Sequence, residues 1–164
     1  VLGKQFEISA KMAKSESYVI PMETSDGSVT GINLKIVRGK EEKGFVDIFF
    51  NDKMSGKVAA SFEVRDDGVS GVIAVSDAQT QKAVSGNISL FTDSLSETES
   101  SIDIKVVHVV DISAEKYLKT SFQKEDKVSS ENTKDRSTVQ TKRLYQVAEG
   151  FIDNIRKIFG PDNL

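Results

Sequence analysis

The amino-acid sequence predicts an α+β domain with a mixed or antiparallel sheet, one central helix packed on that sheet and a C-terminal amphipathic helix. Three observations predict this class. Before residue 76, apolar and polar residues alternate over several short runs bounded by turn residues, as in half-buried strands. Apolar residues then take helical spacing twice, over about 77–96 and about 138–159. A further alternating run lies between these two segments.

The composition indicates a globular domain and excludes several classes of protein. The 164 residues are 38% hydrophobic and 29% charged, which is ordinary for a chain that buries one core. The chain has no cysteine, so disulfides, thiolate metal sites and cysteine nucleophiles are excluded. A net charge of −3 lacks the basic field that binds nucleic acid, so we expect no nucleic-acid partner. No apolar run approaches the roughly 18–20 residues that cross a bilayer, so we expect no membrane insertion.

The N-terminal third predicts a short helix followed by a hairpin. Residues 1–15 have loose helical spacing, which favours a short helix, but Phe6 and Ile8 could equally begin a strand. The run 18–22 predicts a strand, and its Pro21 indicates an edge position because proline cannot donate to a neighbouring strand. A turn at 25–28 leads into the alternating run 32–36, which predicts the second strand.

The middle of the chain predicts three more strands. A charged loop over 39–44 precedes the run 45–50, which is apolar on both faces except for one aspartate and so predicts an interior strand. The alternation over 58–65 predicts the next strand. The Asp-Asp-Gly sequence at 66–68 predicts a tight hairpin into the strand 69–75.

The first amphipathic segment predicts the central helix. Ser76 and Gln79 have the spacing of a capping box, in which the serine hydroxyl and the glutamine side chain satisfy backbone N–H groups at the helix start. The residues behind it with helical spacing are Val84, Ile88, Phe91 and Leu95, which predict a helix over 77–96. The run 102–112 then predicts a final strand.

The rest of the chain predicts a linker and a last helix. We expect a core domain over 1–120, a polar linker or surface excursion over 121–137 and a helix over 138–160. A second capping box at 137–140 opens this helix, and Gly160-Pro161 ends it. Its apolar stripe consists of Leu144, Val147, Ala148, Phe151, Ile152, Ile155 and Phe159.

This stripe permits three interpretations, which the sequence leaves open. The helix packs on the sheet and closes the core, or it binds a groove on a partner protein, or it forms a dimer. In the second case, Leu144, Phe151 and Ile155 are the candidate partner-binding residues.

The sequence predicts no catalytic, metal-binding or cofactor-binding residue. Nucleophilic catalysis by serine needs a base, and the only histidine, His108, falls on the apolar side of its strand, as a core or edge histidine does. The pair Asp66-Asp67 is explained by the turn, and Glu97 and Glu99 by a solvated helix end. We therefore expect no enzyme, and a hydrolase using Asp or Glu is the least favoured hypothesis.

The region 44–110 resembles the C-terminal domain of bacterial flagellar hook-length control proteins. The resemblance rests on a strand, a turn that ends in glycine, a hairpin, a helix and a final strand, and the residues 18–34 resemble the lead-in strands, so that it extends over about 18–112. The segments that carry it are Val46–Phe50, Met54–Val58, Phe62–Val75, the helix of Val84, Ile88, Phe91 and Leu95, and Ile102–Val106. The run 144–148 is similar to uncharacterised clostridial relatives of that family.

The resemblance implies a non-enzymatic protein–protein interaction domain without a cofactor. In that family the domain contacts the cytoplasmic part of the flagellar export gate and switches which substrates are secreted. The implied location is the cytoplasm, before any export through the flagellar apparatus. The alternative is an adaptor or cell-surface binding module that uses the same fold for another partner. Because the chain starts at Val1 and not at Met, we expect its native N-terminus, with any targeting signal, to lie upstream.

Overall fold

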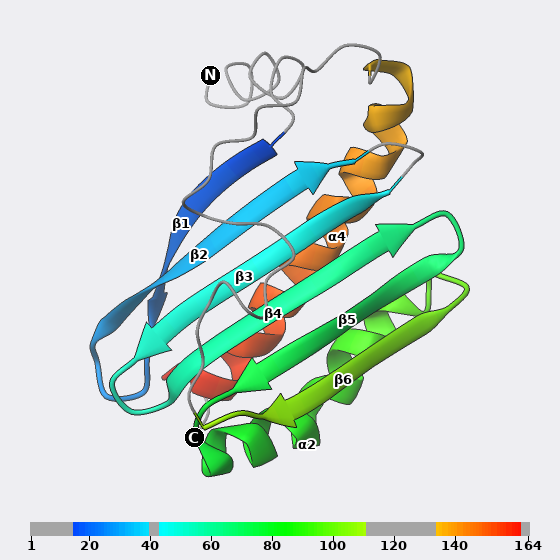
Figure 1. Ribbon diagram of the computed structural model, residues 1–164. Helices are drawn as coiled ribbons and strands as arrows, with labels where there is room; N and C mark the ends of the chain where they lie inside the picture. The colour runs from blue at the N-terminus through cyan, green and yellow to red at the C-terminus, as the bar shows by residue number, and fades with distance from the viewer. Residues whose placement is uncertain (1–14, 40–42, 111–133, 162–164) are drawn as a thin grey trace.

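The computed structural model shows one six-stranded sheet with two helices on the same face (Figure 1). It describes residues 15–39, 43–110 and 134–161. The strands are β1 (Ser15–Glu23), β2 (Val29–Arg38), β3 (Gly44–Asp52), β4 (Gly56–Arg65), β5 (Gly68–Val75) and β6 (Ile102–His108). The helices are α2 (Ala78–Leu95) and α4 (Lys134–Phe159). The predicted α+β class is confirmed.

The strands follow one another across the sheet in chain order, β1-β2-β3-β4-β5-β6. The first five form an antiparallel meander because short turns join them. β6 instead lies parallel to β5, since a return to the same end of the sheet needs a long crossover, which α2 provides. The sheet is therefore mixed, and β1 and β6 are its two edges.

The turn between β3 and β4 shows how local chemistry fixes the meander. The carboxylate of Asp52 accepts hydrogen bonds from the backbone N–H groups of Met54 and Ser55, both at 3.1 Å. Gly56 ends the turn with φ of 82°, and a Cβ there would lie 2.7 Å from Ser76 Oγ. Both the backbone conformation and the lack of space therefore require glycine at this position.

The two helices begin at residues other than the predicted ones. Asp77, not Ser76, is the N-cap of α2, and its side chain accepts from Thr80 N–H at 2.9 Å. Ser76 Oγ instead accepts from Lys57 N–H at 2.9 Å, which ties the start of the helix to β4. α4 begins at Lys134, so the predicted capping box at 137–140 lies inside the helix, and 134–137 are not linker.

Two further sequence predictions differ from the structure or lie beyond it. The strand predicted over 102–112 ends at His108, and Val110 is 82% exposed. The predicted helix at the N-terminus and most of the predicted linker fall within 1–14 and 111–133, outside the described residues. No described helix is long and apolar enough to cross a membrane.

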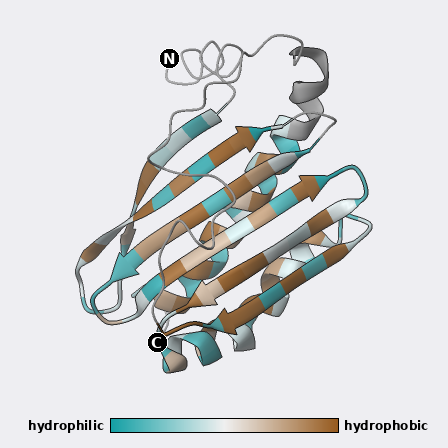
Figure 2. Ribbon diagram, viewed as in Figure 1, coloured by the Kyte–Doolittle hydropathy of each residue, from teal (hydrophilic) through white to brown (hydrophobic). Residues whose placement is uncertain are grey.

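The main core lies between the sheet and the two helices. α4 packs along β2, β3 and β4, whereas α2 packs on β5 and β6 (Figure 1). At the centre, the rings of Phe62, Phe91 and Phe151 pack edge to face in a mutual triangle, with centroids 5.2–5.5 Å apart. β4, α2 and α4 each contribute one of these rings, so the three elements share one core. Hydropathy along the ribbon follows this arrangement, with hydrophobic and hydrophilic residues alternating along β6 (Figure 2).

Candidate functional site

The three candidate partner-binding residues of α4 lie inside the core of the chain itself. Leu144 is 0% exposed, and Phe151 and Ile155 are each 1% exposed. The helix therefore closes the core, which is the first of the three interpretations of its apolar stripe. The physical reason is that α2 packs mainly on β5 and β6, so the sheet over β2–β4 needs cover from α4. In this conformation none of the three side chains is available to a partner.

A partly buried ion pair fixes α4 to the loop after α2. Arg143 donates to both carboxylate oxygens of Glu99, from Nη2 at 2.6 Å and from Nε at 3.1 Å. Its Nη2 also donates to the backbone carbonyl of Arg65 in the β4–β5 hairpin. The Glu99 side chain is 4% exposed, so the sequence prediction of a solvated helix end was wrong for this residue. This pair is structural.

A second polar network joins α4 to the edge of the sheet at β1. The Glu16 carboxylate accepts from Arg38, Tyr18 and Tyr145, with the Tyr18 hydroxyl at 2.5 Å. The hydroxyls of Tyr18 and Tyr145 lie 3.0 Å apart, and Arg38 Nε donates to Thr141 Oγ1 at 2.8 Å. The sequence analysis missed this network because its members are far apart along the chain and share no motif.

The environment of Glu16 shifts the titration of the whole network. Burial alone would raise the pKa of Glu16, but hydrogen bonds from Tyr145, Tyr18 and Arg38 and the charge of Arg38 lower it overall. Burial and the bond to Glu16 raise the pKa of Tyr18 to about 12. The pKa of Tyr145 is raised for the same two reasons. The carboxylate stays charged and both phenols stay neutral near pH 7, so the network can hold α4 against β1 without a change of protonation.

His108 lies at the exposed end of β6, as an edge histidine. Its Nε2 is 3.2 Å from the carbonyl oxygen of Ser76, and the side chain of no described serine or carboxylate is bonded to it. Within residues 15–39, 43–110 and 134–161, no three His, Cys, Asp or Glu side chains are grouped as a metal site requires. His108 therefore has none of the contacts that a catalytic base would need.

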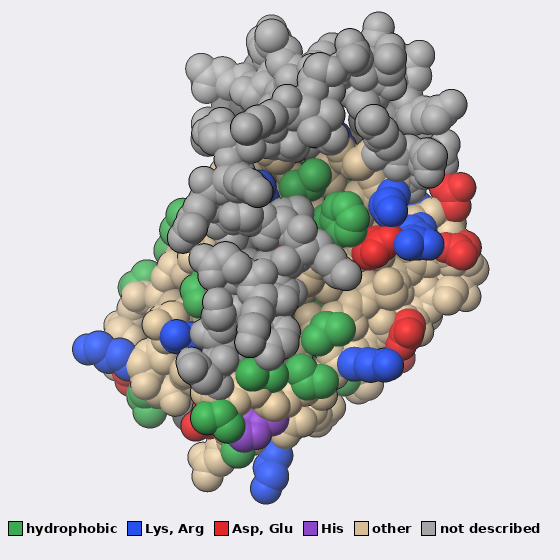
Figure 3. All heavy atoms as spheres, viewed as in Figure 1, with side chains coloured by type: hydrophobic (Ala, Val, Ile, Leu, Met, Phe, Trp, Pro, Cys, Tyr) green, Lys and Arg blue, Asp and Glu red, His purple; other side chains and the backbone are tan. Residues whose placement is uncertain are grey.

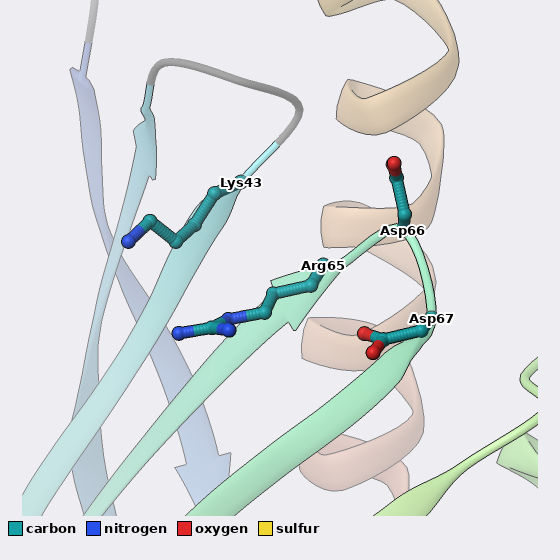
Figure 4. A pocket seen from close by; sticks show the side chains of 4 residues that line it. All are labelled: Lys43, Arg65, Asp66 and Asp67. Carbon is teal, nitrogen blue, oxygen red and sulfur yellow. The ribbon is translucent and has the colours of Figure 1, made fainter.

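One shallow depression lies beside the β4–β5 hairpin and has a volume of about 310 Å³. It is lined by Lys43, Arg65, Asp66 and Asp67 (Figure 4). The two aspartates point in different directions, while the Lys43 and Arg65 side chains extend side by side (Figure 4). Arg65 Nε lies 2.5 Å from Glu63 Oε2, so a cation here already has a counter-charge. Asp66 and Asp67 therefore do not direct their carboxylates at a common point in the depression.

Three other carboxylates act as acceptors in turns and at a helix start. Hydrogen bonds from Thr24 and Ser28 lower the pKa of Asp26 to about 2. Hydrogen bonds from the backbone and side chain of Thr80 lower the pKa of Asp77. Burial by itself would raise the pKa of Asp52, but bonds from Thr30 and two backbone N–H groups lower it overall. These shifts are opposite to the raised pKa of a carboxyl group that acts as a general acid.

The sheet face turned away from α2 and α4, here called the outer face, carries apolar side chains of its own (Figure 3). One cross-strand row runs from Phe49 through Ala59 and Ala74 to Val107, and the two alanines are fully buried. Val109 packs against the same alanines. Val72, on the neighbouring row, is 38% exposed. We call Phe49, Val72, Val107 and Val109 the outer-face patch.

A buried polar row lies beside this patch. Lys35, Asp47 and Ser61 are register partners on β2, β3 and β4, and Ser61 Oγ donates to Asp47 Oδ1 at 2.7 Å. All three are less than 7% exposed although they lie on the outer face. Asp47 is the single polar exception that the sequence analysis noted in an otherwise apolar run. Phe45 and Phe49 lie on the same side of β3 as Asp47, opposite to the residues that face the core. These two apolar side chains were the sequence signal for a second, partly apolar face of the sheet.

Comparison with known proteins adds no relative, since no protein-family model, no curated protein and no solved structure matches this chain.

Proposed function

We propose that this chain is a non-enzymatic protein–protein interaction domain of the hook-length control type, and that its partner is the cytoplasmic domain of the flagellar export gate. The observation that carries the proposal is the outer-face patch. Half-exposed apolar side chains on a rigid sheet are a surface that a protein partner can bury. The proposed place of action is the cytoplasm.

The packing around the patch supports a binding surface. Ala59 and Ala74 are small and buried, so the larger side chains of Phe49 and Val107 stand on either side of them. Strand pairing on both sides holds β4 and β5, which means that little backbone ordering is needed upon binding. A partner that presents apolar side chains here would gain burial at a low entropic cost.

The element order supports the choice of partner. The resemblance rests on a strand, a glycine turn, a hairpin, a helix and a strand, and this is the order from β3 through α2 to β6. In the mechanism implied by the resemblance, the domain switches secretion by binding two states of the gate with unequal affinity. The outer-face patch is our proposed contact for that binding.

The arrangement of carboxylates supports a non-catalytic role over the hydrolase alternative. Glu16, Asp52 and Asp77 each accept several hydrogen bonds within the fold, and their pKa values are lowered. A general acid for hydrolysis needs the opposite shift and an opening that holds substrate.

The test is a calorimetric titration of the chain into the cytoplasmic domain of the export gate from the same organism. We expect one-to-one binding, and we expect Val72→Asp to weaken it about tenfold or more because a charge would be buried against apolar partner atoms. Leu90→Asp is the matched control, since Leu90 is 53% exposed but lies on α2, on the opposite face of the sheet.

Three outcomes separate the parts of the proposal. Binding that Val72→Asp weakens and Leu90→Asp does not would support both the partner and the surface. Binding that Leu90→Asp weakens and Val72→Asp leaves unchanged would move the contact to the helical face. If the unaltered protein unfolds cooperatively but gives no measurable heat of binding at several temperatures, the assignment of this partner is overturned.

A further inference from the structure

β6 forms one edge of the sheet (Figure 1). Its outward backbone groups belong to alternate residues. On the inner side, Val69 N–H donates to the carbonyl of Ser101, and Val109 N–H donates to the carbonyl of Val75, both at 2.9 Å. Odd-numbered residues of β6 therefore bond to β5. In a parallel ladder the alternate residues point the other way, so the N–H and C=O groups of Ile102, Ile104 and Val106 face outward.

The two edges of the sheet differ in their capacity to add a strand. β1 contains Pro21, which has no N–H to donate. β6 contains neither proline nor glycine, and among the described residues no element other than β5 pairs with it. Ile102, Ile104 and Val106 are only partly buried, because the core ends at this edge. A further strand here would complete both the hydrogen bonding and the apolar cover.

The charges of β6 favour one occupant of this edge, a second copy of the same strand. Asp103 and Lys105 are both exposed on the outer face, and neither forms an ion pair within the part of the chain that the structure describes. In an antiparallel pair centred on Ile104, Asp103 lies opposite the partner's Lys105, and Lys105 lies opposite the partner's Asp103. A register centred on Lys105 would instead place two lysines together.

Hydrogen bonding selects the same register. Since Ile104 directs both of its backbone polar groups outward, two copies of Ile104 on a two-fold axis can exchange both bonds. Ile102 then pairs with the partner's Val106 in the same way. The charged residues fall at the intervening positions, where side chains on opposite strands approach most closely.

The pairing would also bring together the two copies of α2. α4 lies on one side of α2, where Asn154 Nδ2 donates to the carbonyl of Asn87 at 3.0 Å. By the helical repeat, the side of α2 nearer the free edge carries Gln81, Ser85, Ile88 and Thr92, all of which are uncharged. Because α2 packs more on β6 than on β5, the two copies of α2 would lie next to each other across the paired edges, and this uncharged side would form the contact between them.

We propose that two copies of this chain associate through their β6 strands, antiparallel and centred on Ile104, to form one continuous twelve-stranded sheet. The dimer is isologous, and two Asp103–Lys105 pairs set its register. Edge pairing of a seven-residue strand buries less area than a standard permanent interface, so the dimer is in exchange with the monomer. This inference does not depend on the proposed gate partner.

The test is sedimentation equilibrium of the full chain up to millimolar concentration, for the unaltered protein and for Asp103→Lys and Lys105→Asp. The unaltered protein should show a monomer–dimer equilibrium. Each single variant places like charges opposite each other at both pairs, so its dissociation constant should rise about tenfold or more. An equimolar mixture of the two variants restores both opposite-charge pairs and should recover a dimer with the original affinity. Both residues are exposed, so both variants should fold, which circular dichroism checks.

The recovery in the mixture is the result that a general surface effect cannot produce. A protein that stays monomeric at millimolar concentration would overturn the proposal. A dimer of unchanged affinity in both single variants would also overturn it, since the contact would then lie away from β6.

Discussion

At the scale of single residues, Glu16 is a polar group that joins separate elements. It lies on β1 and accepts from Arg38 on β2 and from Tyr145 on α4. Its side chain is only 7% exposed. A buried carboxylate is costly unless its oxygens are fully paired, and here the pairing itself holds the last helix against the edge strand.

Glu16→Gln should therefore destabilise the protein by about 1–3 kcal/mol near pH 7, because it removes the charge that Arg38 and both tyrosines face. The pKa of Glu16 is lowered in the folded state, so its contribution is present above its unfolded value of about 4.5 and is lost as the pH falls through the folded value. The difference between the variant and the unaltered protein should shrink accordingly in acid.

Urea unfolding at a series of pH values measures this difference. Glu23→Gln is the matched control, because Glu23 is an exposed glutamate on the same strand. A Glu16→Gln penalty that stays constant down to the lowest pH at which the protein folds would show that charge is not what the network uses.

At the scale of elements, the start of α2 shows where sequence patterns stop being decisive. Ser76-Asp77 offers two consecutive residues that can cap a helix, and the spacing to Gln79 favoured the serine. The structure uses Asp77, because Ser76 is engaged with Lys57 N–H across the sheet. A long-range contact decided between two local options of similar propensity, and no local pattern contains that information.

Asp77→Ala should cost about 1 kcal/mol, since it removes the acceptor for Thr80 N–H at the helix start. Asp77→Asn should cost much less, because asparagine caps helices as well as aspartate does. Equilibrium unfolding in urea measures both. Equal losses of stability in the two variants would mean that the charge of the Asp77 carboxylate matters more than its hydrogen bond. One source of such an effect is the charge of His108, which contributes to lowering the pKa of Asp77.

At the scale of the whole molecule, the sequence was sufficient to predict the sheet and the helices that cover it. It was insufficient to predict the polar contacts between elements and the binding surface. The alternation at β2 and β4 and the stripes of α2 and α4 are one-sided, so the buried face of each of these elements could be predicted. The network at Glu16 and the ion pair at Glu99 join residues that are far apart along the chain. The burial of the candidate partner-binding residues of α4 could not be predicted for a related reason. An apolar stripe has the same pattern whether it covers its own sheet or a partner's groove, and only the packed structure distinguishes the two.

α4 covers one side of the core, so the fold should depend on it. Its buried apolar residues are Leu144, Val147, Ala148, Phe151, Ile152, Ile155 and Ile158. Each large side chain contributes about 1.5–3 kcal/mol by burial, so together they match the roughly 5–15 kcal/mol by which a whole domain is stable. A chain that ends at residue 133 should therefore lose cooperative unfolding and bind a dye for exposed apolar surface, whereas a chain that ends at Pro161 should keep its cooperative transition. Thermal unfolding followed by circular dichroism measures this. If the shorter chain still unfolded cooperatively, β1–β6 and α2 would form a sufficient core, and α4 would again be a candidate for binding a partner.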